Sequence, residues 1–147
     1  MDLKARLQED VKSAMRAGDK PRLGTLRMTM AAIKQREVDE RIELQDADVV
    51  AILEKMVKQR REAKAQYDKA GRTDLSDQEA YEITVLAEFL PKAMEPDEVE
   101  ALIADCISQS GAESVRDMGK VMGLIKSQAQ GSIDMQAVSA LVRAKLA

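Results

Sequence analysis

The sequence contains no histidine, no tryptophan and a single cysteine, Cys106. Without histidine the chain cannot form a Ser-His-Asp or Cys-His nucleophile system, nor a zinc site with histidine ligands. One cysteine excludes CxxC redox chemistry, cysteine-rich metal sites and internal disulfides, which fits a reducing compartment. Because Cys106 lies on an apolar stripe, we expect it to be a small buried hydrophobic residue. We therefore expect neither a metal nor a cofactor.

Aromatic side chains and long apolar runs are also scarce. Tyr67, Tyr81 and Phe89 are the only aromatic residues among 147, so stacking on nucleic-acid bases cannot be a major term in binding. No apolar run approaches the roughly 18–20 residues that span a bilayer. The segment Met1–Arg6 lacks the apolar core of a signal peptide. We expect no membrane association.

The apolar residues that are present recur at helical spacing along almost the whole chain. Leu3, Leu7 and Val11, for example, follow one another every four residues, and Gly18 ends that stripe. Nothing indicates a strand, so we predict an all-α fold. The expected helices cover about 3–17, 19–37, 46–70, 76–90, 96–109, 116–128 and 134–146.

Two further boundaries follow from local signals. The polar stretch at residues 38–45 is typical of a loop, and Ser76 with Glu79 predicts a capping box at the start of the fourth helix. The segment Pro91–Pro96 is the best internal division, because proline disfavours helix before it. We predict an N-terminal subdomain with long helices at 1–91 and a C-terminal three-helix bundle at 92–147.

The net charge is −3, so attraction for nucleic acid must come from local patches. Seven bases against two acids between Lys55 and Arg72, and six against one between Arg16 and Arg36, form two such patches. Their bases could follow a phosphate backbone; the alternative is a solvated surface with i,i+4 ion pairs. The RNA-binding candidates here are Lys55, Lys58, Arg61, Lys69 and Arg72, with Arg22 and Arg27 on the preceding helix.

Two other bases fall on an apolar face of the third helix, where a charge needs a partner or a route to water. These are Arg60 and Lys64, and the fourth helix offers Glu79 and Glu82 at the edges of its apolar stripes. We predict an ion-pair cluster among the four. Its expected role is specific packing, with a catalytic carboxylate pair as the alternative.

Two glycines lie inside a predicted helix of the C-terminal part, at Gly119 and Gly123. Each costs roughly 1 kcal/mol against alanine, so something is expected to come close to that face. A neighbouring helix backbone is one explanation, and a ligand or RNA backbone is the other. Lys120 and Lys126 flank the face and would suit a phosphate.

Several motifs, in order along the chain, carry a resemblance to a known family. They are Lys58–Glu62, Gln66–Arg72, Asp74-Leu75, Glu79 with Glu82, Phe89–Pro91, Asp117–Gly123, Gly131 and Asp134. Together they resemble the YqeY family over essentially the whole chain. The C-terminal part also looks like the tail domain of GatB, the tRNA-binding subunit of the glutamine-dependent Asp/Glu-tRNA amidotransferase.

The resemblance implies a two-part helical protein of the cytoplasm, linked to tRNA or translation. It also carries the label of a carbon–nitrogen ligase with glutamine as amido-N-donor. The chain lacks the kinase core and the ATP and magnesium site of the amidotransferase, and no catalytic constellation is visible in it.

The sequence therefore leaves three candidate functions. The first is a non-catalytic module that binds tRNA or associates with the amidotransferase. The second is a protein-interaction module that docks a translation or replication partner through methionine-rich or two-sided helices. The third is the ligase activity itself. Fold-level analogy alone does not decide among them.

Overall fold

The computed structural model describes residues 2–147. These residues are helical with no strand, which confirms the all-α prediction. The α-helices in chain order are α1 (Leu3–Ala17), α2 (Lys20–Glu40), α3 (Asp46–Lys69), α4 (Thr73–Ala87), α5 (Pro96–Ser110), α6 (Met118–Ala129) and α7 (Met135–Leu146), with a 3-10 turn, η1 (Val115–Asp117), before α6.

The chain divides into two compact units, one ending at Leu90 and the other starting at Pro91. The N-terminal unit holds α1 to α4, and the C-terminal unit holds α5 to α7. Each unit has a hydrophobic core of its own.

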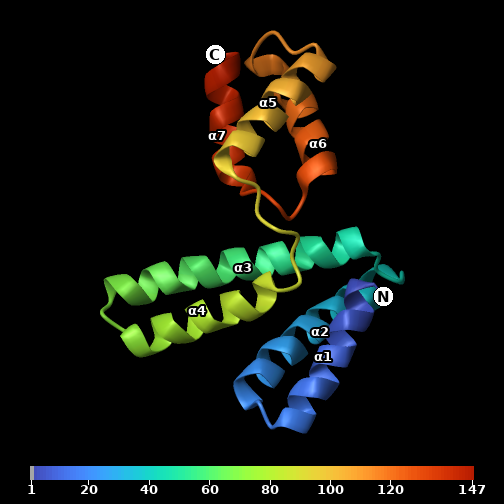
Figure 1. Cartoon of the computed structure of the whole chain (residues 1–147), viewed down its shortest axis with the longest axis vertical. Helices are drawn as coiled ribbons and strands as arrows, with labels where there is room; N and C mark the ends of the chain where they lie inside the picture. The colour runs from blue at the N-terminus through green and yellow to red at the C-terminus, as the bar shows by residue number, and fades with distance from the viewer. Residues whose placement is uncertain (1) are drawn as a thin grey trace. The chain divides into compact units, whose positions relative to one another are not determined.

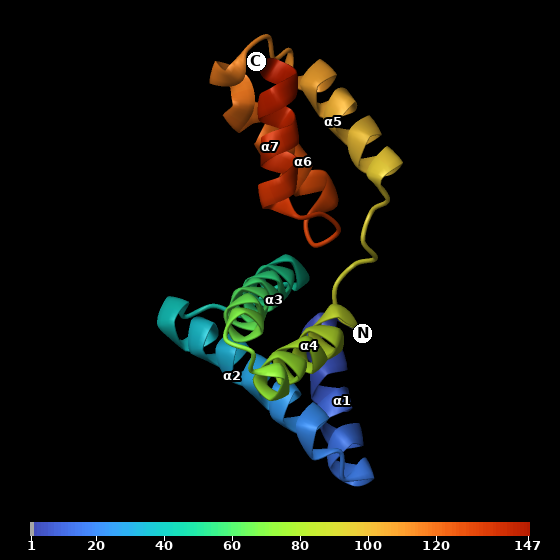
Figure 2. The ribbon, with the colours of Figure 1, turned by 90° about the vertical axis from the view of Figure 1, so that its left-hand side faces the viewer.

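Two antiparallel helix pairs make the N-terminal unit: α1 lies beside α2, and α3 lies beside α4 (Figures 1 and 2). Gly18 closes α1 in the left-handed region at φ 67°, and Asp19 caps α2 by accepting a hydrogen bond from the Arg22 backbone N–H. Every helix contributes fully buried side chains to the core of this unit, which include Leu7, Leu26, Ile33, Leu53 and Leu86.

The second helix is longer than the sequence suggested. It continues to Glu40, and Arg41 ends it in the left-handed region at φ 56°. Glu37 explains the extension, because its carboxylate accepts hydrogen bonds from Lys4 Nζ at 2.9 Å and from the Leu44 N–H at 3.0 Å. The predicted loop at residues 38–45 is therefore shortened to residues 41–45.

The fourth helix also begins earlier than predicted, at Thr73 rather than Ser76. Ser76 is buried inside its first turns, where its hydroxyl donates to Asp68 Oδ1 at the end of α3. The predicted capping box with Glu79 is therefore wrong. The hydroxyl joins α3 to α4 across the turn instead of capping α4.

Three helices form the C-terminal unit around a small apolar core, which includes Ile103, Cys106, Val121, Ile125 and Val142. Gly111 ends α5 at φ 69°. Asp117 then accepts hydrogen bonds from the backbone N–H groups of Glu113 and Ser114, and these bonds hold its pKa below the usual range. The carboxylate thus fixes the entry into α6.

Truncation of a core side chain tests the packing of the N-terminal unit. Because Leu53 is fully buried, we expect Leu53→Ala to lower the free energy of unfolding of this unit by about 2–5 kcal/mol. Native-state hydrogen exchange should show the loss in the amides of α3 and α4. Leu141→Ala, at a side chain that is 42% exposed, is the control and should cost less than about 0.5 kcal/mol. Equal losses in the two variants would contradict the assignment of the core.

Candidate nucleic-acid interface

The buried apolar residues of the third helix lie on one side, and several of its basic residues lie on the opposite side. Leu53, Met56 and Val57 are buried, and they belong to the core that includes Val85 and Leu86 of α4. The other side of α3 is left to solvent. The helix has 24 residues, which corresponds to about 36 Å at 1.5 Å per residue.

Four predicted RNA contacts share that solvent-facing side, which we call the outer face of α3: Lys55, Lys58, Arg61 and Lys69. At about 100° per residue they fall within an arc of about 120° and extend over about 21 Å of the helix. All four are exposed. Within the described residues, no carboxylate lies within 4.0 Å of these four charges.

Arg72 continues the basic run just beyond α3, but it has an acidic neighbour. Its guanidinium lies 3.2 Å from Asp74, and both side chains are more than half exposed. The ion pair holds the pKa of Asp74 below its usual range. A surface pair of this kind contributes roughly 0–1 kcal/mol, so it leaves Arg72 accessible to a phosphate.

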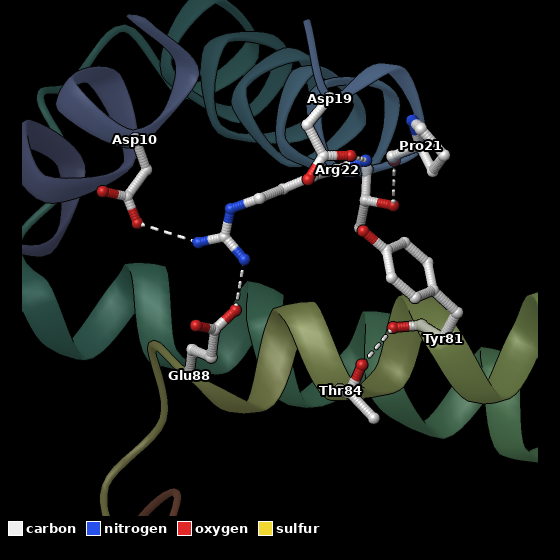
Figure 3. A network of polar contacts seen from close by, with 8 residues as sticks. Asp10, Asp19, Pro21, Arg22, Tyr81, Thr84 and Glu88 are labelled. Atoms are coloured by element: carbon white, nitrogen blue, oxygen red, sulfur yellow. Dashed lines mark hydrogen bonds and ion pairs between the residues drawn. The ribbon is translucent and has the colours of Figure 1, made fainter. Parts of the chain in front are cut away.

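Arg22 has a different role from the one predicted. Its guanidinium bridges Asp10 of α1, at 3.2 Å, and Glu88 just after α4, at 2.5 Å (Figure 3). The hydrogen bond to Glu88 contributes most to raising the pKa of Arg22. Because the charge already joins three parts of the unit, the structure does not support Arg22 as a phosphate contact.

Arg27 is exposed on α2. However, α2 and α3 cross rather than run side by side (Figures 1 and 2). That the two flanks together follow a phosphate backbone stays a prediction. The outer face of α3 is a basic surface of this unit, and the exposed Glu62 lies among its bases.

The predicted ion-pair cluster is present in part. Arg60 Nε lies 2.9 Å from Glu82 Oε2, and both side chains are 13% exposed. Arg60 also donates to the Met56 carbonyl at 3.1 Å. Lys64, in contrast, pairs with Asp68 one turn later in its own helix, at 2.9 Å, so its predicted link to the glutamates is wrong.

Among the described residues, the Glu79 carboxylate makes no hydrogen bond, and its pKa is raised. Burial is the main cause, and the charge of Glu82 adds to it, while Arg60 acts in the opposite direction. Arg60 therefore serves mainly Glu82 and only partly compensates Glu79.

The two glycines of α6 face solvent. A Cβ atom built on Gly119 or Gly123 would meet no described heavy atom within 4 Å. A neighbouring helix of this chain therefore does not explain them, and close approach by another molecule stays a prediction. Lys120 and Lys126 are exposed beside them.

Two contacts at the end of α4 were missed by the analysis of the sequence. One is the bridge that Arg22 makes, and the other places the Arg6 guanidinium 5.3 Å from the centre of the Phe89 ring. Arg22 and Glu88 are 66 positions apart, and Arg6 and Phe89 are also far apart in the sequence, so helical periodicity carries no signal for either contact.

Other kinds of site find little support between residues 2 and 147. Over that range, no three Cys, Asp or Glu residues are grouped to hold a metal ion. The thiol of Cys106 is buried, and burial raises its pKa, which disfavours the reactive thiolate. No helix in the described part of the chain is both long and apolar enough to cross a membrane.

Comparison with known proteins identifies related sequences. The model of the family described as YqeY-like protein matches residues 4–146. A protein of Pyrenophora tritici-repentis named "Altered inheritance of mitochondria protein 41, mitochondrial" is 29% identical over 138 residues, covering 91% of this chain and 75% of the relative. Its namesake in Kluyveromyces lactis is 32% identical over 108 residues, covering 71% of this chain and 58% of the relative. A Schizosaccharomyces pombe relative, named only as uncharacterized, is 30% identical over 91 residues, covering 62% of this chain and 74% of the relative.

These names correct one expectation. The resemblance implied a cytoplasmic protein, and that is wrong, because relatives from three fungi are named as mitochondrial proteins. Their names mention neither tRNA nor an amidotransferase.

The raised pKa of Glu79 predicts a specific effect on stability. A carboxyl whose pKa is raised by folding favours its protonated form, so it opposes folding at pH 7 and less so as pH falls through its folded pKa. We expect Glu79→Gln to raise the free energy of unfolding at pH 7, with a smaller gain at pH 4. Urea unfolding at both pH values measures the difference.

Glu62→Gln, at an exposed position of α3, is the matched control and should change little at either pH. If Glu79→Gln were less stable than the unaltered protein at pH 7, Arg60 would be holding Glu79 as a favourable partner, contrary to this account.

Proposed function

We propose that this chain, which belongs to the YqeY-like protein family, is a non-catalytic module that binds tRNA through the outer face of α3. The observation that carries the proposal is the row of exposed bases on that face, Lys55, Lys58, Arg61 and Lys69, for which residues 2–147 place no carboxylate within 4.0 Å. Free cations on one side of a straight helix suit the regular negative charge of a nucleic-acid backbone.

The lack of an exposed ring on the basic surface favours contact with phosphates over stacking on nucleobases. Phe89 is buried, Tyr67 is partly buried, and the exposed Tyr81 belongs to α4, so the outer face of α3 itself carries no exposed ring. Single-stranded nucleic acids are usually held by such rings, whereas double-helical RNA is recognised through its backbone and shape. The stems of a folded tRNA fit the second description.

The C-terminal unit would add a second contact. Lys120 and Lys126 are exposed on α6, and the open face at Gly119 and Gly123 allows a backbone to come close. This is the part that resembles the tail domain of GatB, so association with the tRNA amidotransferase is the corresponding expectation for it. The ligase activity has no supporting group of side chains in residues 2–147, and we do not favour it.

Charge reversal on α3 tests the proposal. We expect Lys58→Glu with Arg61→Glu to weaken binding to total tRNA by tenfold or more, because two phosphate contacts are lost and replaced by repulsion. The slope of log affinity against log salt should become shallower by about 1.4–1.8, at roughly 0.7–0.9 for each phosphate neutralised. Fluorescence titrations with labelled tRNA at several salt concentrations measure both quantities.

The same change of charge on α1 provides the control. Lys12 and Arg16 are exposed, and Lys12→Glu with Arg16→Glu should leave tRNA affinity within about threefold, since α1 is not part of the proposed surface. A flat salt dependence of the unaltered protein, or equal losses in the two double variants, would reject the outer face of α3 as the binding surface.

A further inference from the structure

The second helix is apolar on two sides, and the core uses only one of them. Leu26 and Ile33 are fully buried on the inner side. On the outward side, Met28 is 42% exposed, with its sulfur 3.8 Å from the Arg60 guanidinium of α3, and Val38 is 63% exposed. Isolated exposed apolar residues are ordinary, but a line of them along one helix face suggests a surface that another molecule covers.

These exposed residues follow one another at regular spacing. We define the outer seam of α2 as Gly24, Met28, Ala31, Gln35 and Val38, which all are exposed and are separated by four, three, four and three residues. Ile42, 47% exposed, follows at the next four-residue step, just after the helix ends. Alternating steps of three and four are the heptad spacing with which one helix packs along another.

The small residues of the seam leave room for a close neighbour. A Cβ atom built on Gly24 would meet no described heavy atom within 4 Å. A glycine inside a helix costs roughly 1 kcal/mol against alanine, and packing within this chain does not require it. Gly24 is the first seam residue, and Ala31 lies between Met28 and Gln35, so the backbone of a second helix could approach at both positions.

One flank of the seam is uniformly basic. Lys20, Arg27 and Lys34 recur every seven residues and are all exposed. In the described part of the chain, none of the three has a carboxylate within 4.0 Å. Their heptad spacing matches that of the seam, so the three charges border it along most of its length. Residues in this position usually select the partner helix by its charge.

We propose that the outer seam of α2 docks an amphipathic helix of a partner protein, whose own apolar seam is bordered by aspartate or glutamate. The acidic border is required by Lys20, Arg27 and Lys34, and the apolar seam by Met28 and Val38. This interaction is separate from tRNA binding by α3 and does not depend on it.

Two other occupants fit the surface less well. A second copy of α2 packed antiparallel would place each basic flank against the same bases of its partner, which like-charge repulsion disfavours. A nucleic acid would bind the basic side chains of the flank but would leave Met28, Val38 and Ile42 exposed, since phosphates offer no apolar surface to cover them.

A pair of synthetic peptides provides the probe. Both are 21-residue amphipathic helices with leucine at heptad seam positions; one carries glutamate and the other lysine at the flanking positions. Fluorescence anisotropy with the full chain at low salt should show at least tenfold tighter binding of the glutamate peptide. Amide chemical shifts should change along α2. Val38→Ser with Ile42→Ser should weaken binding at least fivefold, whereas Leu141→Ser, an exposed leucine of α7, should not.

A charge swap separates specific docking from general attraction. Arg27→Glu with Lys34→Glu should reverse the preference toward the lysine peptide. The α3 variant Lys58→Glu with Arg61→Glu should keep the original preference, even if tRNA binding is lost. The proposal is overturned if neither peptide binds, if the swap leaves the preference unchanged, if a duplex RNA displaces the peptide from α2, or if the chain forms dimers that bury this seam.

Discussion

The packing of α3 against α4 is the constraint on which the rest of the N-terminal unit depends. One side of α3 must bury Leu53, Met56 and Val57, so the position of every other residue on this helix follows from its angle to that side. Lys55, Lys58, Arg61 and Lys69 are left in solvent on the outer face. The proposed binding surface is thus a consequence of core formation, and it needs no special loop or cavity.

The same packing explains why Arg60 is held between α3 and α4. It lies at the edge of the buried side, where an unpaired guanidinium would lose hydration without compensation. Glu82 of α4 supplies the compensating charge at 2.9 Å. Glu79, one turn earlier, shares the partly buried environment but not the hydrogen bond, and its pKa is raised by burial. The pair and its uncompensated neighbour are therefore best understood as features of packing.

The helix pair α1 and α2 is attached to the end of α4 by two cations of different kinds. Arg22 bridges Asp10 and Glu88, and Arg6 lies over the ring of Phe89. With the inner side of α2 engaged in this way, the helix presents its outer seam to solvent. The N-terminal unit consequently offers two distinct surfaces: a basic one on α3 suited to phosphates, and an apolar one with a basic border on α2 suited to a helix.

The amino-acid sequence by itself determined the helical class, because this class depends on periodicity and composition within short segments. Local signals misplaced three boundaries by three residues each. These are the end of α2, which Glu37 extends by binding Lys4 and Leu44, the start of α4, where Ser76 binds Asp68, and the end of α4, which lies at Ala87. Only the tertiary structure decided which cations are free. Arg22 and Lys58 look alike in the sequence, but the first meets carboxylates brought from distant positions by folding, and the second meets none within 4.0 Å among the described residues.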